Sequence, residues 1–144
     1  MAPLNRNRVL VVEDHDDSRN LLARLLGQHY EVLTATNFES ALAVAAELPP
    51  TTVITDIALG PGGDGLALMR EIRKTHQICG IAVSGYPPKN PQSLLDAGLI
   101  KWILKPIQFN VLLDAVAEAC AAAGNGDCSL PPITDPAQTD WHGK

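Results

Sequence analysis

The sequence predicts an α/β protein in which helices cover both faces of a parallel β-sheet. Short apolar runs alternate with helical patterns five times along the chain. Runs such as RVLVVE are almost continuously apolar, which is typical of strands buried on both faces. Strict alternation of strand and helix favours a doubly wound sheet of five parallel strands.

Each element is predicted from its local pattern. The strands are β-branched or apolar runs, expected at residues 8–13, 31–35, 51–55, 78–84 and 100–104. The helices have apolar residues at helical spacing, expected at residues 18–28, 37–48, 66–74, 90–98 and 109–123. Asn37 and Asp64 stand where N-caps are needed, because a short polar side chain there can accept a free backbone N–H.

Composition excludes several classes of protein. With 144 residues, 46% hydrophobic and 19% charged, the chain fits one globular domain. A net charge of −5 argues against a nucleic-acid partner, which usually needs a basic patch. No apolar stretch approaches the roughly 20 residues of a membrane helix, and the N-terminal apolar run is too short for a signal peptide.

The cysteines and the C-terminus complete the organisation. Cys79, Cys120 and Cys128 lack CxxC spacing, so we expect reduced thiols in a cytoplasmic protein rather than a disulfide framework. After Ala123 the composition becomes rich in Gly, Pro and Asp. The expected division is therefore a domain at residues 6–123 and a flexible tail at residues 124–144.

Polar side chains follow four of the five predicted strands. Glu13 and Asp14 stand at the end of the first strand, Asp56 at the end of the third, Ser84 at the end of the fourth and Lys105 at the end of the fifth. Because the carboxyl ends of parallel strands share one edge of the sheet, these groups are expected to converge there. Any one of them alone could be a turn, cap or surface residue. Together they predict a site.

The chemistry of this set points to phosphoryl transfer. Three clustered carboxylates repel one another unless a cation lies among them, and hard oxygen ligands suit Mg²⁺. Asp56 could then act as a nucleophile that forms an acyl phosphate. Lys105 would stabilise the charge of the transferring group, and Ser84 could donate a hydrogen bond to it.

These residues lie in motifs with a known order. The segments VLVVEDHDDSR, VITDIALGPGGDG, IAVSGY and WILKPI resemble, in order and spacing, a response-regulator receiver domain of the CheY-like kind. The resemblance implies a flavodoxin-like (βα)5 fold with strand order 2-1-3-4-5. It implies that Asp56 is the phosphoacceptor, and that Glu13, Asp14, Asp56 and the backbone carbonyl of Ala58 bind Mg²⁺.

The same resemblance assigns a switch. Ser84 matches the hydroxyl that moves toward the phosphoryl group, and Trp102 matches the aromatic residue that follows it inward. The surface of the fourth helix, fifth strand and fifth helix then changes. Ala58 and Tyr86 match positions that tune the dephosphorylation rate, and the bond between Lys105 and Pro106 is expected to be cis.

The resemblance also implies the partners. A histidine kinase or phosphotransfer protein would donate the phosphoryl group, and a downstream protein would read the switched surface, with the chain a monomer or a phosphorylation-linked dimer. Such a chain is not an enzyme beyond its own phosphorylation and dephosphorylation. Because 21 residues after the fifth helix cannot hold an output domain, a single-domain regulator is expected.

Three alternatives stay open. The chain could be the receiver of a hybrid histidine kinase. It could be a Mg²⁺-dependent aspartyl-phosphate phosphatase of the haloacid-dehalogenase kind, whose DxD motif Asp14-x-Asp16 would match. It could be an FMN-binding flavodoxin, although its first loop is acidic rather than rich in Ser, Thr and Gly.

Overall fold

The computed structural model describes residues 7–59, 63–88 and 91–124. It contains one sheet of five parallel strands in the order β2-β1-β3-β4-β5, which confirms the predicted fold class. The strands are β1 (Arg8–Val12), β2 (Glu31–Ala35), β3 (Thr52–Asp56), β4 (Cys79–Ser84) and β5 (Leu99–Leu104). The helices are α1 (Asp16–Leu26), α2 (Phe38–Glu47), α3 (Gly65–Arg73), α4 (Pro91–Asp96) and α5 (Phe109–Gly124).

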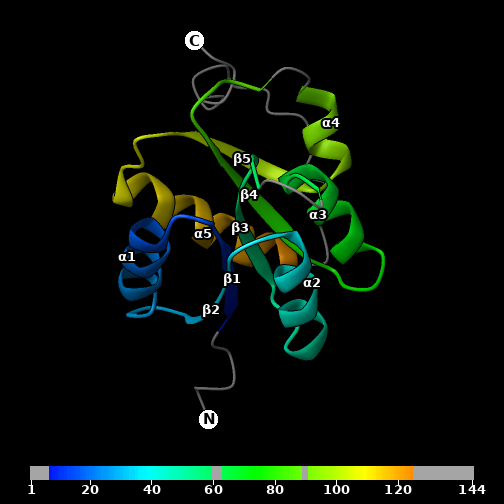
Figure 1. The fold of residues 1–144 in the computed structure, drawn as a ribbon, viewed down its shortest axis with the longest axis horizontal. Helices are drawn as coiled ribbons and strands as arrows, with labels where there is room; N and C mark the ends of the chain where they lie inside the picture. The colour runs from blue at the N-terminus through cyan, green and yellow to red at the C-terminus, as the bar shows by residue number, and fades with distance from the viewer. Residues whose placement is uncertain (1–6, 60–62, 89–90, 125–144) are drawn as a thin grey trace.

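Two hydrophobic clusters hold the helices against the sheet. Helices α1 and α5 cover one face, whereas α2, α3 and α4 cover the other (Figure 1). Along β1, Val9 and Val11 belong to the first cluster and Leu10 and Val12 to the second, because successive side chains of a strand point to opposite faces. This two-sided burial explains the continuous apolar runs of the sequence.

Helix starts follow the capping chemistry of the sequence. The Asn37 side chain accepts the backbone N–H of Ser40 at 2.8 Å, and the Ser40 hydroxyl accepts the N–H of Asn37 in return, which is a capping box. Asp64 accepts the N–H of Ala67 at 2.8 Å at the start of α3. Helix α1 begins at Asp16, two residues before the predicted start, with two acids in its first turn where they complement the helix dipole.

Two thiol predictions have different outcomes. Cys120 is a free, buried thiol whose sulfur lies 3.3 Å from the hydroxyl oxygen of Thr52. Cys79 is disulfide-bonded, so the prediction of a reduced thiol is wrong there. The lack of CxxC spacing therefore does not exclude a disulfide at Cys79.

The fold leaves one edge of the sheet open for chemistry. Helix α5 begins at that edge, and all five strands run toward it (Figure 1). The tail was predicted at residues 124–144; Gly124 instead ends α5, and residues 125–144 lie outside the described residues. Within the described part of the chain, no helix has the length and apolar character needed to cross a bilayer.

Candidate metal centre

Three carboxylates meet at the carboxyl edge of the sheet. Glu13 and Asp14 follow β1, and Asp56 is the last residue of β3. Each can offer one carboxylate oxygen such that these oxygens all lie within 4.8 Å of one another. Glu13 is 4% exposed and Asp56 8%, whereas Asp14 faces solvent. The predicted convergence of the acids is therefore what the structure shows.

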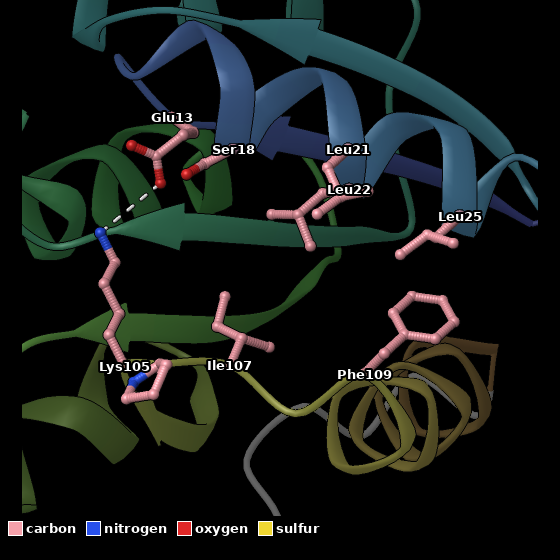
Figure 2. A pocket seen from close by; sticks show the side chains of 9 residues that line it. Glu13, Ser18, Leu21, Leu22, Leu25, Lys105, Ile107 and Phe109 are labelled. Carbon is pink, nitrogen blue, oxygen red and sulfur yellow. Dashed lines mark ion pairs between the residues drawn. The ribbon is translucent and has the colours of Figure 1, made fainter.

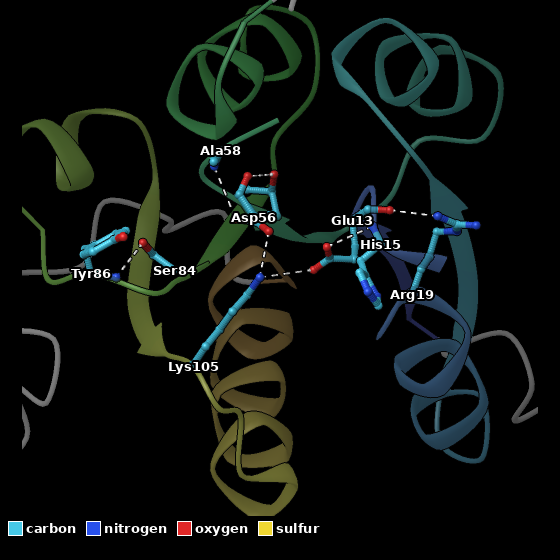
Figure 3. A network of polar contacts seen from close by, with 9 residues as sticks. Glu13, His15, Arg19, Asp56, Ala58, Ser84, Tyr86 and Lys105 are labelled. Atoms are coloured by element: carbon cyan, nitrogen blue, oxygen red, sulfur yellow. Dashed lines mark hydrogen bonds and ion pairs between the residues drawn. The ribbon is translucent and has the colours of Figure 1, made fainter. Parts of the chain in front are cut away.

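Glu13 is held as a buried acid. One oxygen of its carboxylate accepts the backbone N–H of His15 at 3.1 Å, and the other lies 3.7 Å from Nζ of Lys105 (Figure 3). Burial raises the pKa of Glu13, and the neighbouring Asp56 carboxylate adds to that rise against the lowering effects of the His15 N–H and Lys105. The site therefore favours a cation that would relieve the crowding of negative charge.

Asp56 is fixed through both carboxylate oxygens. Oδ1 accepts the backbone N–H of Ala58 at 3.2 Å, and Oδ2 accepts a hydrogen bond of 2.8 Å from Nζ of Lys105 (Figure 3). Its own backbone carbonyl oxygen accepts the hydroxyl of Thr55 at 2.9 Å. A carboxylate at the end of a buried strand, held in this way, has little freedom to turn away from the site.

Lys105 lies between the two buried acids. It directly follows β5, and its peptide bond with Pro106 is cis. Partial burial opposes the charge of Lys105, but the hydrogen bond and the charge of Asp56, together with Glu13, outweigh that effect and raise the pKa of Lys105. Lys105 is therefore a firmly charged ammonium group that reaches the centre of the acidic cluster.

The hydroxyl and the two aromatic residues come from the end of β4, the loop after it and β5. The Ser84 side chain is buried, and its hydroxyl oxygen accepts the backbone N–H of Tyr86 at 3.1 Å. Trp102 on β5 is 7% exposed and donates its indole N–H to the carbonyl oxygen of Tyr86 at 2.9 Å. The Tyr86 ring itself is exposed. Trp102 thus lies inward in this structure, against the cluster under α4.

Two features of the site were not predicted. Arg19 of α1 donates a hydrogen bond of 3.0 Å to the backbone carbonyl oxygen of Glu13. The sequence signal for it is weak, because only its spacing from Asp16, three residues earlier on a helix, suggests an ion pair. Side chain to backbone bonds of this kind depend on the exact path of the loop.

The second feature is a pocket of about 280 Å³ beside the acids. Glu13 and Lys105 stand at one end of it, and apolar side chains of α1 and of the segment that leads into α5 line the remainder, among them Leu21, Leu25 and Phe109 (Figure 2). Leu21 is 52% exposed. The sequence places these leucines at helical spacing, and only the packing of α1 beside α5 shows that they border a pocket.

The donor set fits Mg²⁺. This ion takes oxygen ligands, usually one or two carboxylates, and retains several waters. The acidic cluster offers carboxylates at the edge of the sheet, with Asp14 open to solvent for a hydrated ion. Lys105 already neutralises part of the charge, which leaves room for one divalent cation.

Fold and site together define a flavodoxin-like α/β domain with an acidic site at the carboxyl edge of its sheet. The sequence profile described as response regulator receiver domain matches residues 9–117 of this chain. The chain belongs to that family. Receiver domains serve phosphorylation-dependent signalling in two-component systems and bind Mg²⁺ at an acidic site.

Several individual proteins are similar to this chain over most of its length. The transcriptional regulatory protein AruR of Pseudomonas aeruginosa is 38% identical over 132 residues, which cover 87% of this chain and 54% of that protein. An uncharacterized 14.6 kDa protein of Leptolyngbya boryana is 30% identical and is covered to 96%, with 85% of this chain matched. The crystal structure of the receiver domain of NtrX from Brucella abortus is 34% identical, with a TM-score of 0.67, and the match covers 78% of this chain and 98% of that one.

The relatives differ in length. This chain spans 54% of AruR and only 24% of another transcriptional regulator that it matches. The shared part is the receiver domain, so the similarity concerns that module.

Proposed function

We propose that this chain is a signalling receiver that accepts a phosphoryl group on Asp56 with the help of Mg²⁺. A histidine kinase or a phosphotransfer protein is the donor. The observation that carries the proposal is the position of the Asp56 carboxylate, 2.8 Å from Nζ of Lys105 and within reach of the Glu13 and Asp14 carboxylates. Glu13, Asp14, Asp56 and the backbone carbonyl of Ala58 would hold the ion, which supplies charge stabilisation during the transfer.

The transfer is a substitution at phosphorus. One oxygen of the Asp56 carboxylate attacks the phosphoryl group, the P–N bond to the donor imidazole breaks, and the imidazole leaves with the electron pair of that bond. Lys105 stands beside the attacking carboxylate and stabilises the charge that gathers on the phosphoryl oxygens. The buried position of Asp56 keeps it aimed at the donor.

The response follows from the loop after β4. The Ser84 hydroxyl accepts the N–H of Tyr86, which leaves its own proton to be donated to a phosphoryl oxygen. Movement of Ser84 would pull on Tyr86 and therefore on the indole of Trp102, which is bonded to Tyr86. The surface of α4, β5 and α5 then changes its affinity for a downstream protein.

Several finer assignments belong to this proposal. The receiver unit is taken as residues 6–123, acting in the cytoplasm, either as a monomer or as a dimer linked to phosphorylation. Ala58 and Tyr86 stay predictions as positions that tune the lifetime of the phosphoryl group. Family membership supports the receiver over the phosphatase and flavodoxin alternatives.

A phosphorylation experiment tests the proposal. Incubation of the chain with acetyl phosphate and Mg²⁺ is expected to give one phosphoryl adduct by intact mass spectrometry, lost in Asp56→Asn and in the presence of a chelator. Asp64→Asn is a matched control, because it makes the same chemical change at an N-cap that Asn serves equally well. An adduct that persists in Asp56→Asn contradicts the assignment.

A further inference from the structure

Arg19 of α1 joins the helix to the segment that carries the acids. Its Nη1 donates a hydrogen bond of 3.0 Å to the backbone carbonyl oxygen of Glu13, and its Nη2 bonds a carboxylate oxygen of Asp16 (Figure 3 shows the first of these bonds). The Arg19 side chain is 14% exposed, although Asp16 is 78% exposed. A planar guanidinium group with several N–H donors can hold both oxygens at once.

The oxygen that Arg19 binds belongs to the peptide unit between Glu13 and Asp14. Because this unit is planar, fixing its carbonyl also fixes the direction in which the chain leaves Glu13 and enters Asp14. The Glu13 N–H donates to the carbonyl of Ala35 at 3.1 Å, and the Glu13 carboxylate accepts the N–H of His15 at 3.1 Å. Arg19 thus makes one of several contacts that hold the segment, and its contact comes from a side chain of α1.

We propose that Arg19 is a positioning residue for the Mg²⁺ site: it holds the Glu13–Asp14 peptide so that both carboxylates face Asp56. It binds no metal itself. This inference rests on the proposed function, because it takes the cation to lie among Glu13, Asp14 and Asp56.

Because Arg19 is charged, the direction in which Mg²⁺ affinity changes when Arg19 is replaced tests the inference. A cation beside a cation site repels the incoming ion, so loss of the Arg19 charge would by electrostatics alone tighten Mg²⁺ binding. Loss of a contact that orients the ligands has the opposite effect, since removal of groups that support metal ligands typically weakens affinity by about 10- to 100-fold. The two roles of Arg19 therefore predict changes in opposite directions.

The experiment measures Mg²⁺ affinity of the full chain by isothermal titration calorimetry. We expect Arg19→Gln to weaken Mg²⁺ binding by about 10-fold. Arg19→Lys keeps the charge but not the planar fork, and is expected to weaken binding by a smaller factor. Arg24→Gln makes the same change of charge and size on an exposed residue in the last turn of the same helix, and is expected to leave the affinity unchanged.

A second readout requires no metal. In the metal-free protein, the backbone amide resonances of Asp14 and His15 are expected to move in Arg19→Gln and to stay in place in Arg24→Gln. If Arg19→Gln does not fold, the Mg²⁺ affinity and the amide resonances are measured on Arg19→Lys instead, because lysine retains the charge and nearly the length of the side chain.

The outcomes separate this inference from the proposed function. Mg²⁺ binding in Arg19→Gln that is as tight as in the unmodified chain, or tighter, overturns the role of Arg19 alone, provided that Asp14→Asn weakens binding. If Asp14→Asn binds Mg²⁺ as the unmodified chain does, the metal site itself is misassigned, and the role of Arg19 is overturned with it.

Discussion

The indole N–H of Trp102 donates a hydrogen bond of 2.9 Å to the backbone carbonyl oxygen of Tyr86. The N–H of the same Tyr86 is bound by the hydroxyl oxygen of Ser84 at 3.1 Å. One backbone residue therefore links the hydroxyl at the site to the aromatic side chain of β5. Displacement of Ser84 is therefore expected to alter the surroundings of the Trp102 indole.

This link predicts a fluorescence response. Beryllofluoride with Mg²⁺, an analogue of the bound phosphoryl group, is expected to change the emission of Trp102, because the hydrogen bond and the packing of its indole change when Ser84 moves. The measurement uses Trp141→Phe, which leaves Trp102 as the one tryptophan of the chain. Asp56→Asn should abolish the response. Unchanged emission in the presence of a bound analogue would show that Trp102 takes no part in the switch.

Lys105→Met should separate metal binding from phosphorylation. Nζ of Lys105 lies 2.8 Å from Asp56 and 3.7 Å from Glu13, so its removal leaves the acids without their internal cation. We expect tighter Mg²⁺ binding in calorimetry and phosphorylation by acetyl phosphate that is about 100-fold slower, since charge stabilisation in the transition state is lost.

Lys101→Met provides the matched control for that variant. Lys101 lies on β5, the strand that Lys105 follows, and pairs with Glu118 at 3.4 Å, away from the acidic cluster. Lys101→Met should change neither the Mg²⁺ affinity nor the rate of phosphorylation by acetyl phosphate. Weaker Mg²⁺ binding or an unchanged rate in Lys105→Met would contradict the role given to Lys105.

Gly65 should tolerate no side chain. A Cβ atom there would lie 2.7 Å from the backbone carbonyl oxygen of Asp56, and backbone cannot give way as a flexible side chain can. Gly65→Ala is expected to lower the free energy of unfolding by about 1–3 kcal/mol in urea denaturation and to slow phosphorylation, because the end of β3 must shift.

Gly85→Ala is the comparison for that variant. A Cβ atom at Gly85 would meet nothing within 4 Å, although this residue also borders the site, next to Ser84. We expect unfolding of Gly85→Ala to match that of the unmodified chain. Equal stability of the two alanine variants would show that the contact between Gly65 and Asp56 is easily relieved.

The Cys120 thiol should make stability depend on alkaline pH. Burial raises the pKa of this thiol, despite its contact with Thr52. The folded chain therefore keeps the proton at pH values where the unfolded thiol, with a pKa of about 8.5, loses it. This contribution to stability is complete below that value and is lost as the pH rises toward the higher folded pKa.

The measurement compares urea unfolding at two pH values with a phosphine reductant present. Between roughly pH 7.5 and pH 9.5, the ionisation of Cys120 should lower the free energy of unfolding by at most about 1.4 kcal/mol. Cys120→Ala should remove that part of the pH dependence, while the titration of all other groups stays the same in both chains. If the free energy of unfolding depends on pH equally in the two chains, the pKa of Cys120 is not raised in the folded state.

Local sequence patterns predicted the helices and strands well because the interactions that start these elements involve residues close together in the sequence. Asn37 and Asp64 cap the helices as expected, since a cap needs only the N–H groups three residues onward. The ends of other elements moved by one or two residues; α4, for example, spans Pro91–Asp96 rather than residues 90–98. Such ends depend on packing against the sheet, which the sequence does not display.

The acidic site was predictable for a topological reason. Parallel strands end at one edge, so residues that follow different strands must converge whatever the details of packing. Glu13, Asp56 and Lys105 meet there for that reason, although 92 residues of sequence separate the first from the last.

The sequence by itself determined the order of the elements, the two-sided burial of the strands and the identity of the groups at the carboxyl edge. Those properties depend on periodicity and on residue type. Only the tertiary structure decided that Lys105 bonds Asp56 rather than solvent, that Trp102 lies inward on the Tyr86 carbonyl, and that Arg19 reaches back to Glu13. Those contacts join residues across loops, and a hydrogen bond forms only where the path of each loop brings donor and acceptor within about 3 Å.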